Sequence, residues 1–347
     1  MPEVPGPVAL RDHTTLRLGG PARRWVRAET TEELLATVRD CDGAGEPVLV
    51  LGGGSNVVVA DAGFDGTVVE VATRGVHPDG ERVEVAAGEG WDAFVAGAVA
   101  SGWVGVEALT GIPGAVGATP IQNVGAYGQE VAQTIAAVRV WDRESAVVRT
   151  FAAADCGFGY RTSRFKTERY GDGSGSRYVV LTVTFQLRPG SLGAPVAYAE
   201  LARALGVEVG QRAPAADVAA AVRRLRAGKG MVLDAADHDT WSAGSFFTNP
   251  LLGADEAARL PEGAPRFAQP DGTVKTSAAW LIQHAGFAPG HGDGPATLST
   301  KHTLALTNRG HATTGDLLAL AAEIRSGVQQ RFGITLHPEP VLVGCSL

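Results

Sequence analysis

The amino-acid sequence predicts an α+β protein with more than one domain. Its 347 residues correspond to two or three domains at about 150 residues each. Near the start, a helical segment and short apolar strands broken by a glycine turn are typical of a β-α-β unit. After Pro189 the pattern changes to longer helices with short strands between them, which predicts a second, separate α+β unit.

The first predicted helix begins with Thr30 as its cap, carries an apolar stripe of Leu34, Leu35 and Val38, and ends near Gly43. Short strands are then predicted at 47–51, 57–60 and 67–71. The glycine-rich segment 52–56 lies between the first two. A glycine turn directly after a strand is typical of units that handle nucleotides.

The middle of the chain is predicted as a strand at 83–86, a helix at 91–101, a long glycine-punctuated loop at 105–128, and a hairpin of strands 136–141 and 146–151. A strand of period two follows at 178–187, and 171–176 is expected to be a flexible surface loop. In the last part, helices are predicted at 213–227, 277–285 and 314–332, with strands at 303–306 and 340–343. The final helix is expected to end at Gly333.

Charge and composition exclude several classes of function. The net charge of −7 argues against a nucleic-acid binder, whose contact face is basic. Three scattered cysteines are too few for a disulfide framework or a cysteine-rich metal site, and the histidines lack metal-ligand spacing, so no metal is expected. No run of 18 apolar residues occurs and the N-terminal residues do not resemble a signal peptide. The expectation is a cytoplasmic protein that spans no membrane.

Lysine is scarce, since the 30 basic residues include only Lys166, Lys229, Lys275 and Lys301. All other basic residues are arginines, so these four lysines are candidates for positions that need a compact ammonium. The alternative is that they lie by chance on solvated faces. Lys229 is the best candidate, because an ammonium acts as a point charge on a phosphate.

Two glycine-rich loops carry the first chemical signal. The sequence Gly-Gly-Gly-Ser-Asn at 52–56 follows a strand, so its N–H groups can face an anion. It is not a Walker A loop, because no Gly-Lys-Ser/Thr sequence follows it. It is not the dinucleotide fingerprint either, because Val57 stands at the third glycine position. A plain tight turn explains it equally well.

The second loop, 109–128, has five glycines with Pro113 and Pro120 among them. That combination predicts a rigid loop whose backbone donors face a flat ring or a pyrophosphate. A glycine-rich packing loop is the alternative.

These motifs, followed by Gly159-Tyr160-Arg161, the segment Gly-Ser-Phe-Phe-Thr-Asn-Pro at 244–250 and Leu-His-Pro-Glu at 336–339, resemble the UDP-N-acetylenolpyruvoylglucosamine reductase family. The resemblance runs from about residue 12 to residue 344. It implies an FAD-binding fold of the vanillyl-alcohol-oxidase (PCMH) type, followed by a smaller α+β C-terminal substrate domain. The expected domains are 12–72 and 73–190, two FAD-binding subdomains, and 205–344, with the last strand (339–344) a candidate to return to the first domain.

The resemblance places catalytic residues at Arg161, Ser245 and Glu339. It places the FAD-binding residues at Gly52, Gly53, Gly54, Ser55, Asn56, Thr110, Gly111, Ile112, Pro113, Gly114, Gly117, Ala118, Asn123, Gly125, Ala126, Tyr127 and Gly128. Substrate-binding positions are Tyr160, Tyr198, Lys229, Asn249 and His302. The chain departs from the family where His13 stands in place of an asparagine, and where the stretch 168–177 is longer. Tyr198 indicates the subgroup that closes a tyrosine-bearing loop over substrate.

The implied reaction is the NADPH-dependent reduction of UDP-N-acetylglucosamine enolpyruvate to UDP-N-acetylmuramate, mediated by one non-covalent FAD, in peptidoglycan precursor synthesis. Arg161 offers a planar fork to the substrate carboxylate, and a protonated Glu339 can donate a hydrogen bond to the developing charge. Ser245 is expected to give the proton to C2. Structurally, the three could instead be a surface ion-pair arginine, a capping serine and a strand-end carboxylate.

Two other functions remain open from the sequence. One is an oxidase of a sugar or hydroxy acid on the same FAD-binding fold, although no histidine lies between Gly52 and Gly66 to link FAD covalently. The other is a catalytically inactive nucleotide- or sugar-binding module. The protein is expected to be a monomer.

Overall fold

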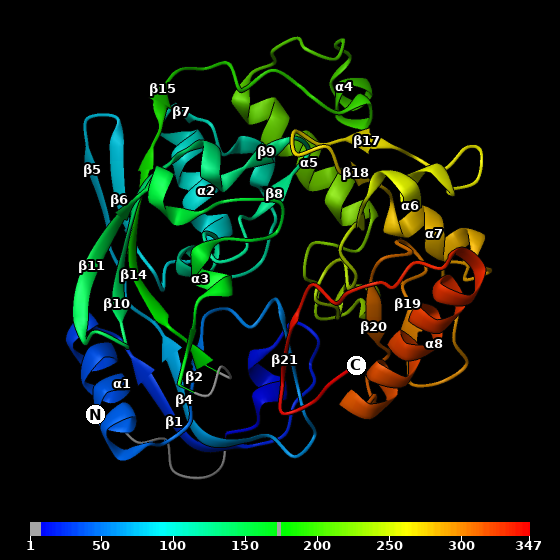
Figure 1. Ribbon diagram of the computed structural model, residues 1–347. Helices are drawn as coiled ribbons and strands as arrows, with labels where there is room; N and C mark the ends of the chain where they lie inside the picture. Colours follow the sequence, from blue (N-terminus) through cyan, green and yellow to red (C-terminus); the bar gives the residue numbers. More distant parts are fainter. Residues whose placement is uncertain (1–7, 172–174) are drawn as a thin grey trace. The chain divides into compact units, whose positions relative to one another are not determined.

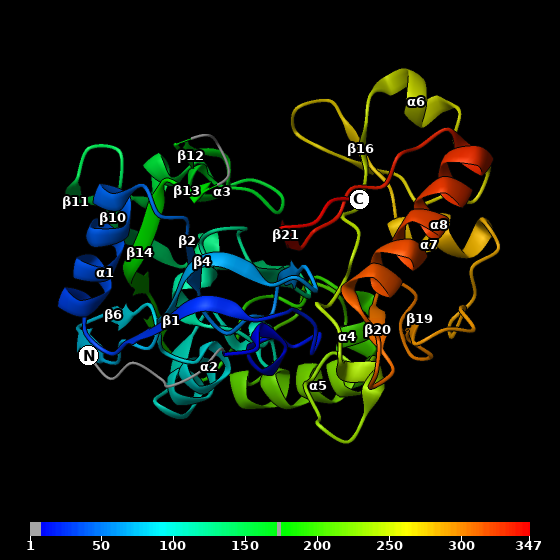
Figure 2. The same ribbon diagram turned by 90° about the horizontal axis from the view of Figure 1, so that it is seen from below.

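The computed structural model describes residues 8–171 and 175–347. The chain forms two compact units (Figures 1 and 2). The first unit contains residues 22–54 and 64–228, and the second contains residues 9–21, 55–63 and 229–347. The domain bounds 12–72, 73–190 and 205–344 stay predictions.

A small parallel sheet begins the first unit. Its strand order is β1 (Ala22–Ala28), β4 (Phe64–Val71) and β2 (Val48–Leu51), and α1 (Thr31–Ala44) packs against it. Thr30 and Glu33 form the capping box of α1. The helix runs one residue past Gly43, because Gly45 supplies the left-handed φ of 66° that ends it. Sequence analysis missed β1, whose exposed arginines hide its apolar alternation.

A larger antiparallel sheet follows in the order β11 (Val147–Ala152), β10 (Ile135–Asp142), β14 (Tyr178–Gln186), β6 (Arg82–Ala86) and β5 (Val76–Asp79). The predicted hairpin is confirmed as β10 and β11, which pair from Asp142 and Val147 outward. Helix α2 (Trp91–Ala100) packs on this sheet through Trp91 and Phe94, whose ring centroids lie 5.8 Å and 5.0 Å from that of Phe185. Trp91 also bonds to the glycine-rich loop, since its Nε1 donates to the carbonyl of Leu109 at 3.1 Å and its N–H donates to the carbonyl of Gly114 at 3.0 Å.

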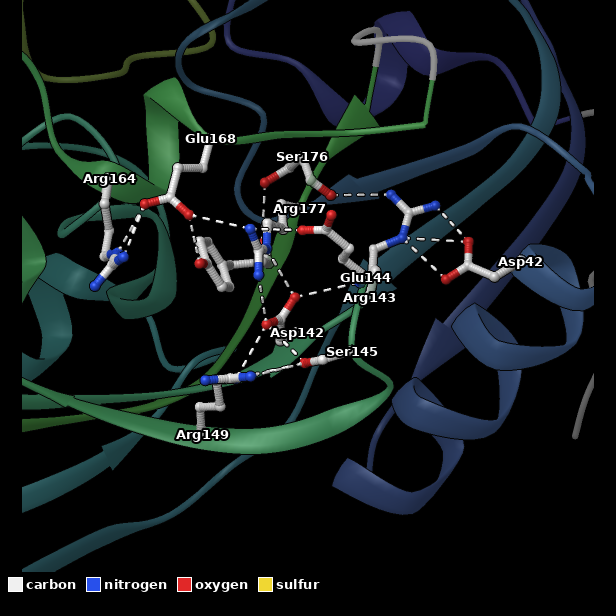
Figure 3. Close-up of polar contacts among 11 residues, drawn as sticks. Asp42, Asp142, Arg143, Glu144, Ser145, Arg149, Arg164, Glu168, Ser176 and Arg177 are labelled. Carbon is white, nitrogen blue, oxygen red and sulfur yellow. Dashed lines mark hydrogen bonds and ion pairs between the residues drawn. The ribbon is translucent and has the colours of Figure 1, made fainter.

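A network of charged side chains lies beside β10 (Figure 3). The fully buried carboxylate of Asp142 accepts hydrogen bonds of 2.9 Å from Arg177 and pairs with Arg149 at 3.0 Å. The adjacent Arg143 pairs with Asp42 of α1. The expected loop 171–176 is entered by β12 (Arg169–Tyr170) and left by β13 (Gly175–Ser176), which pair with each other. The rest of it, 172–174, lies outside the described residues.

The first unit ends in a hairpin-like segment that contains one helix, followed by a second, longer helix. Residues 191–196 run antiparallel to residues 210–215, and α4 (Ala199–Leu205) lies between these two legs. Val196 and Leu201 pack against Val218 and Val222 of α5 (Ala215–Gly228). We call residues 191–215 the α4 hairpin.

The second unit contains the apolar cluster around Phe246, Phe247 and Ile324. Helices α7 (Ala278–His284) and α8 (Thr314–Phe332) pack side by side, and α8 lies against the hairpin β19 (Ala296–Leu298) and β20 (Leu306–Asn308) (Figures 1 and 2). The strand predicted at 303–306 was wrong in its bounds. Residues 303–305 form a turn, closed by a hydrogen bond from the N–H of Ala305 to the carbonyl of His302, and the strand begins only at Leu306.

The last strand, β21 (Val341–Val343), pairs in parallel with β3 (Val57–Val59). Among the described residues, no helix is long and apolar enough to cross a membrane. The remaining short strands and helices are β7 (Trp103–Val104), β8 (Gly125–Ala126), β9 (Gln129–Glu130), α3 (Arg164–Thr167), β15 (Arg188–Pro189), β16 (Leu251–Leu252), α6 (Ala254–Ala258), β17 (Phe267–Ala268) and β18 (Val274–Lys275). The 3-10 helices are η1 (Leu10–His13), η2 (Glu107–Leu109), η3 (Val116–Ala118), η4 (Val131–Gln133), η5 (Ala153–Cys156) and η6 (His238–Thr240).

Candidate active site

Within the first unit, Gly52 and Gly53 of the first glycine-rich loop lie directly against the second loop. A Cβ added to Gly53 would lie 2.7 Å from the Cα of Gly114, and one added to Gly52 would lie 3.2 Å from the Cβ of Ala115. The two loops can approach each other this closely only because Gly52 and Gly53 lack side chains. The structure therefore brings together two segments that sequence analysis assigned to one ligand.

The loop 110–128 is fixed to the sheet below it by its backbone. The N–H of Gly117 donates to the carbonyl of Ala87, and a Cβ on Gly117 would lie only 2.5 Å from the Cβ of Ala87. Gly111 and Gly114 have φ values of 74° and 123°, which glycine adopts without strain. The loop is thus held closely to the core, as expected of a rigid binding surface.

Asp92 of α2 connects this loop to α5. Its carboxylate accepts a 2.7 Å hydrogen bond from the N–H of Gly111 and pairs with Arg223 at 2.7 Å. Sequence analysis did not single out Asp92. A lone aspartate in the first turn of a helix carries no signal by itself beyond favourable placement near the helix dipole.

Three predicted site residues have a left-handed backbone. Asn123 and Tyr127 have φ values of 50°, and Arg161 has 54°. Within residues 8–171 and 175–347 only five non-glycine residues have positive φ, and three of them belong to the predicted site. Such conformations are strained, and they persist where the surroundings hold them.

Hydrogen bonds hold Arg161 against the glycine-rich loop. Its Nη2 donates to the carbonyl of Gly125 at 3.1 Å, and its Nη1 lies 3.5 Å from the carbonyl of Asn123. The Nδ2 of Asn123 in turn donates to the carbonyl of Gly159 at 3.1 Å. The guanidinium carbon of Arg161 also lies 5.7 Å from the ring centroid of Tyr160. The predicted catalytic arginine and the predicted flavin loop are therefore neighbours.

A second guanidinium, Arg226 near the end of α5, was missed by sequence analysis. Burial lowers its pKa to about 10, Tyr127 and Asp92 raise it, and Arg161 lowers it. The group still carries its charge at neutral pH. Together Arg161 and Arg226 give the region beside Tyr127 a positive field, which suits anionic ligands on a chain of net negative charge. In a sequence with 30 basic residues, only burial distinguishes this arginine.

Tyr198, at the N-terminal end of α4, lies beside the end of the same loop. Its ring is 54% exposed, and its centroid lies 6.2 Å from that of Tyr127 in an edge-on arrangement. A Cβ on Gly128 would lie 2.6 Å from the Cβ of Ala197. The exposed phenol therefore stands next to the glycine-rich loop 110–128 within the first unit.

Ser245 and Glu339 lie on neighbouring extended segments of the second unit. The N–H of Glu339 donates to the carbonyl of Phe246 at 2.8 Å, and the N–H of Thr248 donates to the carbonyl of His337 at 3.0 Å. Phe246 is buried and anchors the pair. Gly244 has a φ of 73°, so the turn into Ser245 favours glycine. Two of the three predicted catalytic residues are thus on adjacent backbones, with both side chains half-buried.

Further predicted residues lie around this pair. The Nδ2 of Asn56 lies 3.4 Å from the carbonyl of Glu339. The carbonyl of Leu304 accepts from the N–H of Phe246 at 2.7 Å, which places the turn of His302 beside the Ser245 segment. The Oδ1 of Asn249 accepts a 2.9 Å hydrogen bond from the N–H of Ala278 at the start of α7.

Lys229 begins the second unit, directly after α5, and is half-buried. In the part of the chain that is described, no three histidine, cysteine or acidic side chains gather closely enough to hold a metal ion.

Comparison with known proteins identifies similar chains. Residues 22–150 match a family described as an FAD binding domain, and residues 235–343 match the C-terminal domain of UDP-N-acetylenolpyruvoylglucosamine reductase. The UDP-N-acetylenolpyruvoylglucosamine reductase of Cutibacterium acnes is 59% identical, over 98% of this chain and 90% of that protein. The protein of the same description from Thermobifida fusca is 57% identical over 98% of each chain. The crystal structure of UDP-N-acetylenolpyruvylglucosamine reductase from Thermus caldophilus is similar with a TM-score of 0.67 and 26% identity, covering 98% of this chain and 99% of that one.

Proposed function

This chain belongs to the UDP-N-acetylenolpyruvoylglucosamine reductase family, and we propose that it reduces the enolpyruvyl group of UDP-N-acetylglucosamine enolpyruvate to give UDP-N-acetylmuramate, with NADPH as reductant. The observation that carries the proposal is identity of 59% over 98% of the chain with a reductase of that description. The contacts within each unit add physical support. The product is a precursor of peptidoglycan.

The residues of the first unit fit an FAD molecule. Gly53 lies against Gly114 with no room for a side chain, since a Cβ added to Gly53 would lie 2.7 Å from the Cα of Gly114. A surface without side chains lets backbone N–H groups approach a pyrophosphate or a flat ring. We assign FAD to the segments 52–56 and 110–128. FAD held by these segments would supply hydride transfer from NADPH to the substrate double bond.

Arg161 is suited to hold the carboxylate of the enolpyruvyl group. Hydride addition to C3 places negative charge on that carboxylate, so a fixed cation beside it lowers the barrier. Two contacts to the loop carbonyls of Gly125 and Asn123 fix the guanidinium before substrate arrives. Arg226 adds a second positive charge to this region.

Ser245 and Glu339 complete the proposed chemistry from the second unit. We assign to the hydroxyl of Ser245 the proton that C2 requires, and to a protonated Glu339 a hydrogen bond to the developing charge. The support is that both residues occupy adjacent hydrogen-bonded segments around Phe246. We assign Tyr160, Tyr198, Lys229, Asn249 and His302 to substrate binding.

We place the enzyme in the cytoplasm and expect it to act as a monomer. Nucleotide sugars and NADPH are substrates of the cell interior. The three cysteines, Cys41, Cys156 and Cys345, are free thiols, as is usual for proteins of a reducing compartment.

The decisive experiment measures NADPH oxidation by the purified protein with and without the enolpyruvyl sugar nucleotide, under anaerobic conditions. Substrate-dependent oxidation, with UDP-N-acetylmuramate identified by mass spectrometry, is expected. In a separate aerobic assay, oxygen consumption with a sugar or hydroxy acid by a flavoprotein that does not turn over the enolpyruvyl nucleotide would replace this function with an oxidase. Flavin released into the supernatant by acid precipitation is expected for non-covalent FAD.

A further inference from the structure

A buried carboxylate that the proposed chemistry does not use lies at the foot of the loop 110–128. Glu107, in η2, has no exposed surface. Its Oε2 accepts a 2.6 Å hydrogen bond from the N–H of Gly105, and its Oε1 accepts from the Nε2 of Gln129 at 2.8 Å and from the N–H of Ala194 at 2.7 Å. Burial of a carboxylate is unfavourable unless its oxygens are well bonded, and three N–H donors satisfy this one.

Two of the three donors flank the glycine-rich loop 110–128, and the third is in the α4 hairpin. Gly105 lies just before the glycine-rich loop, and Gln129 directly follows its last glycine, Gly128. Ala194 belongs to a leg of the α4 hairpin, which carries Tyr198 four residues further on. The Oε1 of Gln129 also accepts from the N–H of Ala108 at 2.7 Å, so the two ends of the loop are tied together beneath it.

The sequence of the leg is adapted to this contact. A Cβ on Gly193 would lie 2.7 Å from the Oε1 of Glu107, so a larger residue would push the leg away from the carboxylate. In the structure Gly193 is buried and bonds to the carbonyl of Ala213 at 2.9 Å, and Ala194 bonds to Glu107. This leg is therefore attached to Glu107 through Ala194, four residues before the exposed Tyr198.

We propose that Glu107 is a positioning residue that fixes the α4 hairpin to the flavin loop and thereby sets where Tyr198 stands beside Tyr127. The proposal rests on the proposed function in one respect, namely that Tyr198 contacts the sugar nucleotide. In this role Glu107 itself contacts no ligand. It acts through the N–H of Ala194 and the amide of Gln129.

Two variants disturb this contact in different ways. Glu107→Gln keeps the size of the side chain but turns one acceptor into an amide that must face a backbone N–H. Gly193→Ala leaves Glu107 unchanged and inserts a methyl group against its Oε1. The matched control is Asp142→Asn, which neutralises another fully buried carboxylate of the same unit, in the network of Figure 3, away from the predicted site residues.

The first measurement is hydrogen exchange of backbone amides, which needs no substrate. Relative to the other amides of the first unit, exchange faster by about tenfold or more is expected at Ala194 and through α4 in both variants, and no such local change in Asp142→Asn. Unchanged protection of Ala194 in both variants would overturn the proposal. If Glu107→Gln fails to fold, Gly193→Ala alone decides. A wild-type enzyme without turnover of the enolpyruvyl nucleotide would end the proposed function but leave this measurement intact.

The second measurement separates binding from chemistry. Both variants are expected to raise KM for the sugar nucleotide by about tenfold, the size of one lost charge-assisted hydrogen bond, with the rate of flavin reduction by NADPH unchanged. In a Tyr198→Phe background the effect of Glu107→Gln is expected to shrink, because both changes act on one contact. An undiminished effect there, or a fall in flavin reduction of the same size, contradicts positioning through Tyr198.

Discussion

Arg161 donates a 3.1 Å hydrogen bond from its Nη2 to the carbonyl of Gly125, although the two residues lie 36 positions apart in the sequence. The same arginine has a left-handed φ of 54°. A strained backbone and a contact to a loop carbonyl together fix the direction of the guanidinium. Because the cation is placed before ligand binds, its electrostatic effect costs little reorganisation.

Replacing Arg161 with lysine is expected to slow reoxidation of reduced flavin by the enolpyruvyl nucleotide by about 10²-fold, since a lysine cannot bond Gly125 and a carboxylate with one planar fork. Stopped-flow absorbance of the pre-reduced variant measures this step. Flavin content and reduction by NADPH serve as controls and are expected to stay near wild type. A variant with wild-type reoxidation would leave Arg161 without its assigned role.

Gly53→Ala is expected to reduce bound FAD strongly, because the added methyl group would lie 2.7 Å from the Cα of Gly114. The ratio of flavin to protein absorbance after purification gives the result. Gly43→Ala is the matched control, since that position lies in α1 with open space around it. There alanine is expected to stabilise the helix by about 0.5–1 kcal/mol. Equal flavin content in the two variants would argue against the placement of FAD.

Ser245→Ala separates the two half-reactions. Reduction of flavin by NADPH needs no proton at C2 of the sugar nucleotide, so it is expected to be nearly unchanged. Product formation is expected to fall by about 10²–10⁴-fold, the usual loss with a general acid. Rapid mixing of reduced variant with substrate under anaerobic conditions measures this, and Ser245→Cys is expected to recover part of the rate. Fast product formation by the alanine variant would move the proton source to Glu339 or a water molecule.

Lys229→Ala is expected to weaken binding of the sugar nucleotide by about 10- to 150-fold, the range of one hydrogen bond to a charged group. Titration calorimetry with the enolpyruvyl nucleotide gives the affinity, and the flavin content is expected to be unchanged. Lys301→Ala is the control, because Lys301 pairs with Asp237 in the structure. Equal affinity in wild type and Lys229→Ala would remove the diphosphate role.

The ion pair of Asp142 with Arg177 is expected to make the free energy of unfolding depend on pH. Hydrogen bonds from Arg177 hold the pKa of the Asp142 carboxyl well below its usual range. A lowered folded-state pKa stabilises the protein above the unfolded value of about 3.9, and this contribution is lost as the pH falls below it. Urea unfolding between pH 7 and pH 3 is expected to show falling stability for wild type. Asp142→Asn is expected to be about 2 kcal/mol less stable at pH 7 and to show a weaker pH dependence. Parallel pH curves for the two proteins would contradict this assignment.

Local sequence determined the regular elements with strong end signals. Thr30 and Glu33 set the start of α1, and Gly333 ended α8 as predicted. Capping and glycine stops act within a few residues, so they can be recognised without knowing the fold. The motifs also identified Arg161, Ser245 and Glu339 as candidates. Weak elements such as β1, or the strand that begins at Leu306 rather than Thr303, depend on pairing with distant strands and were missed or misplaced.

Only the tertiary structure shows which residues far apart in the sequence lie in contact. The motifs assigned both glycine-rich loops to one ligand, but no local pattern indicates that Gly53 abuts Gly114, or that the carboxylate of Glu107 binds Ala194 at a separation of 87 residues. The burial of Arg226 likewise depends on what α5 packs against. Periodicity and caps are local properties of the chain, whereas close approach, burial and hydrogen bonding across long separations arise only when the sheets and helices pack together.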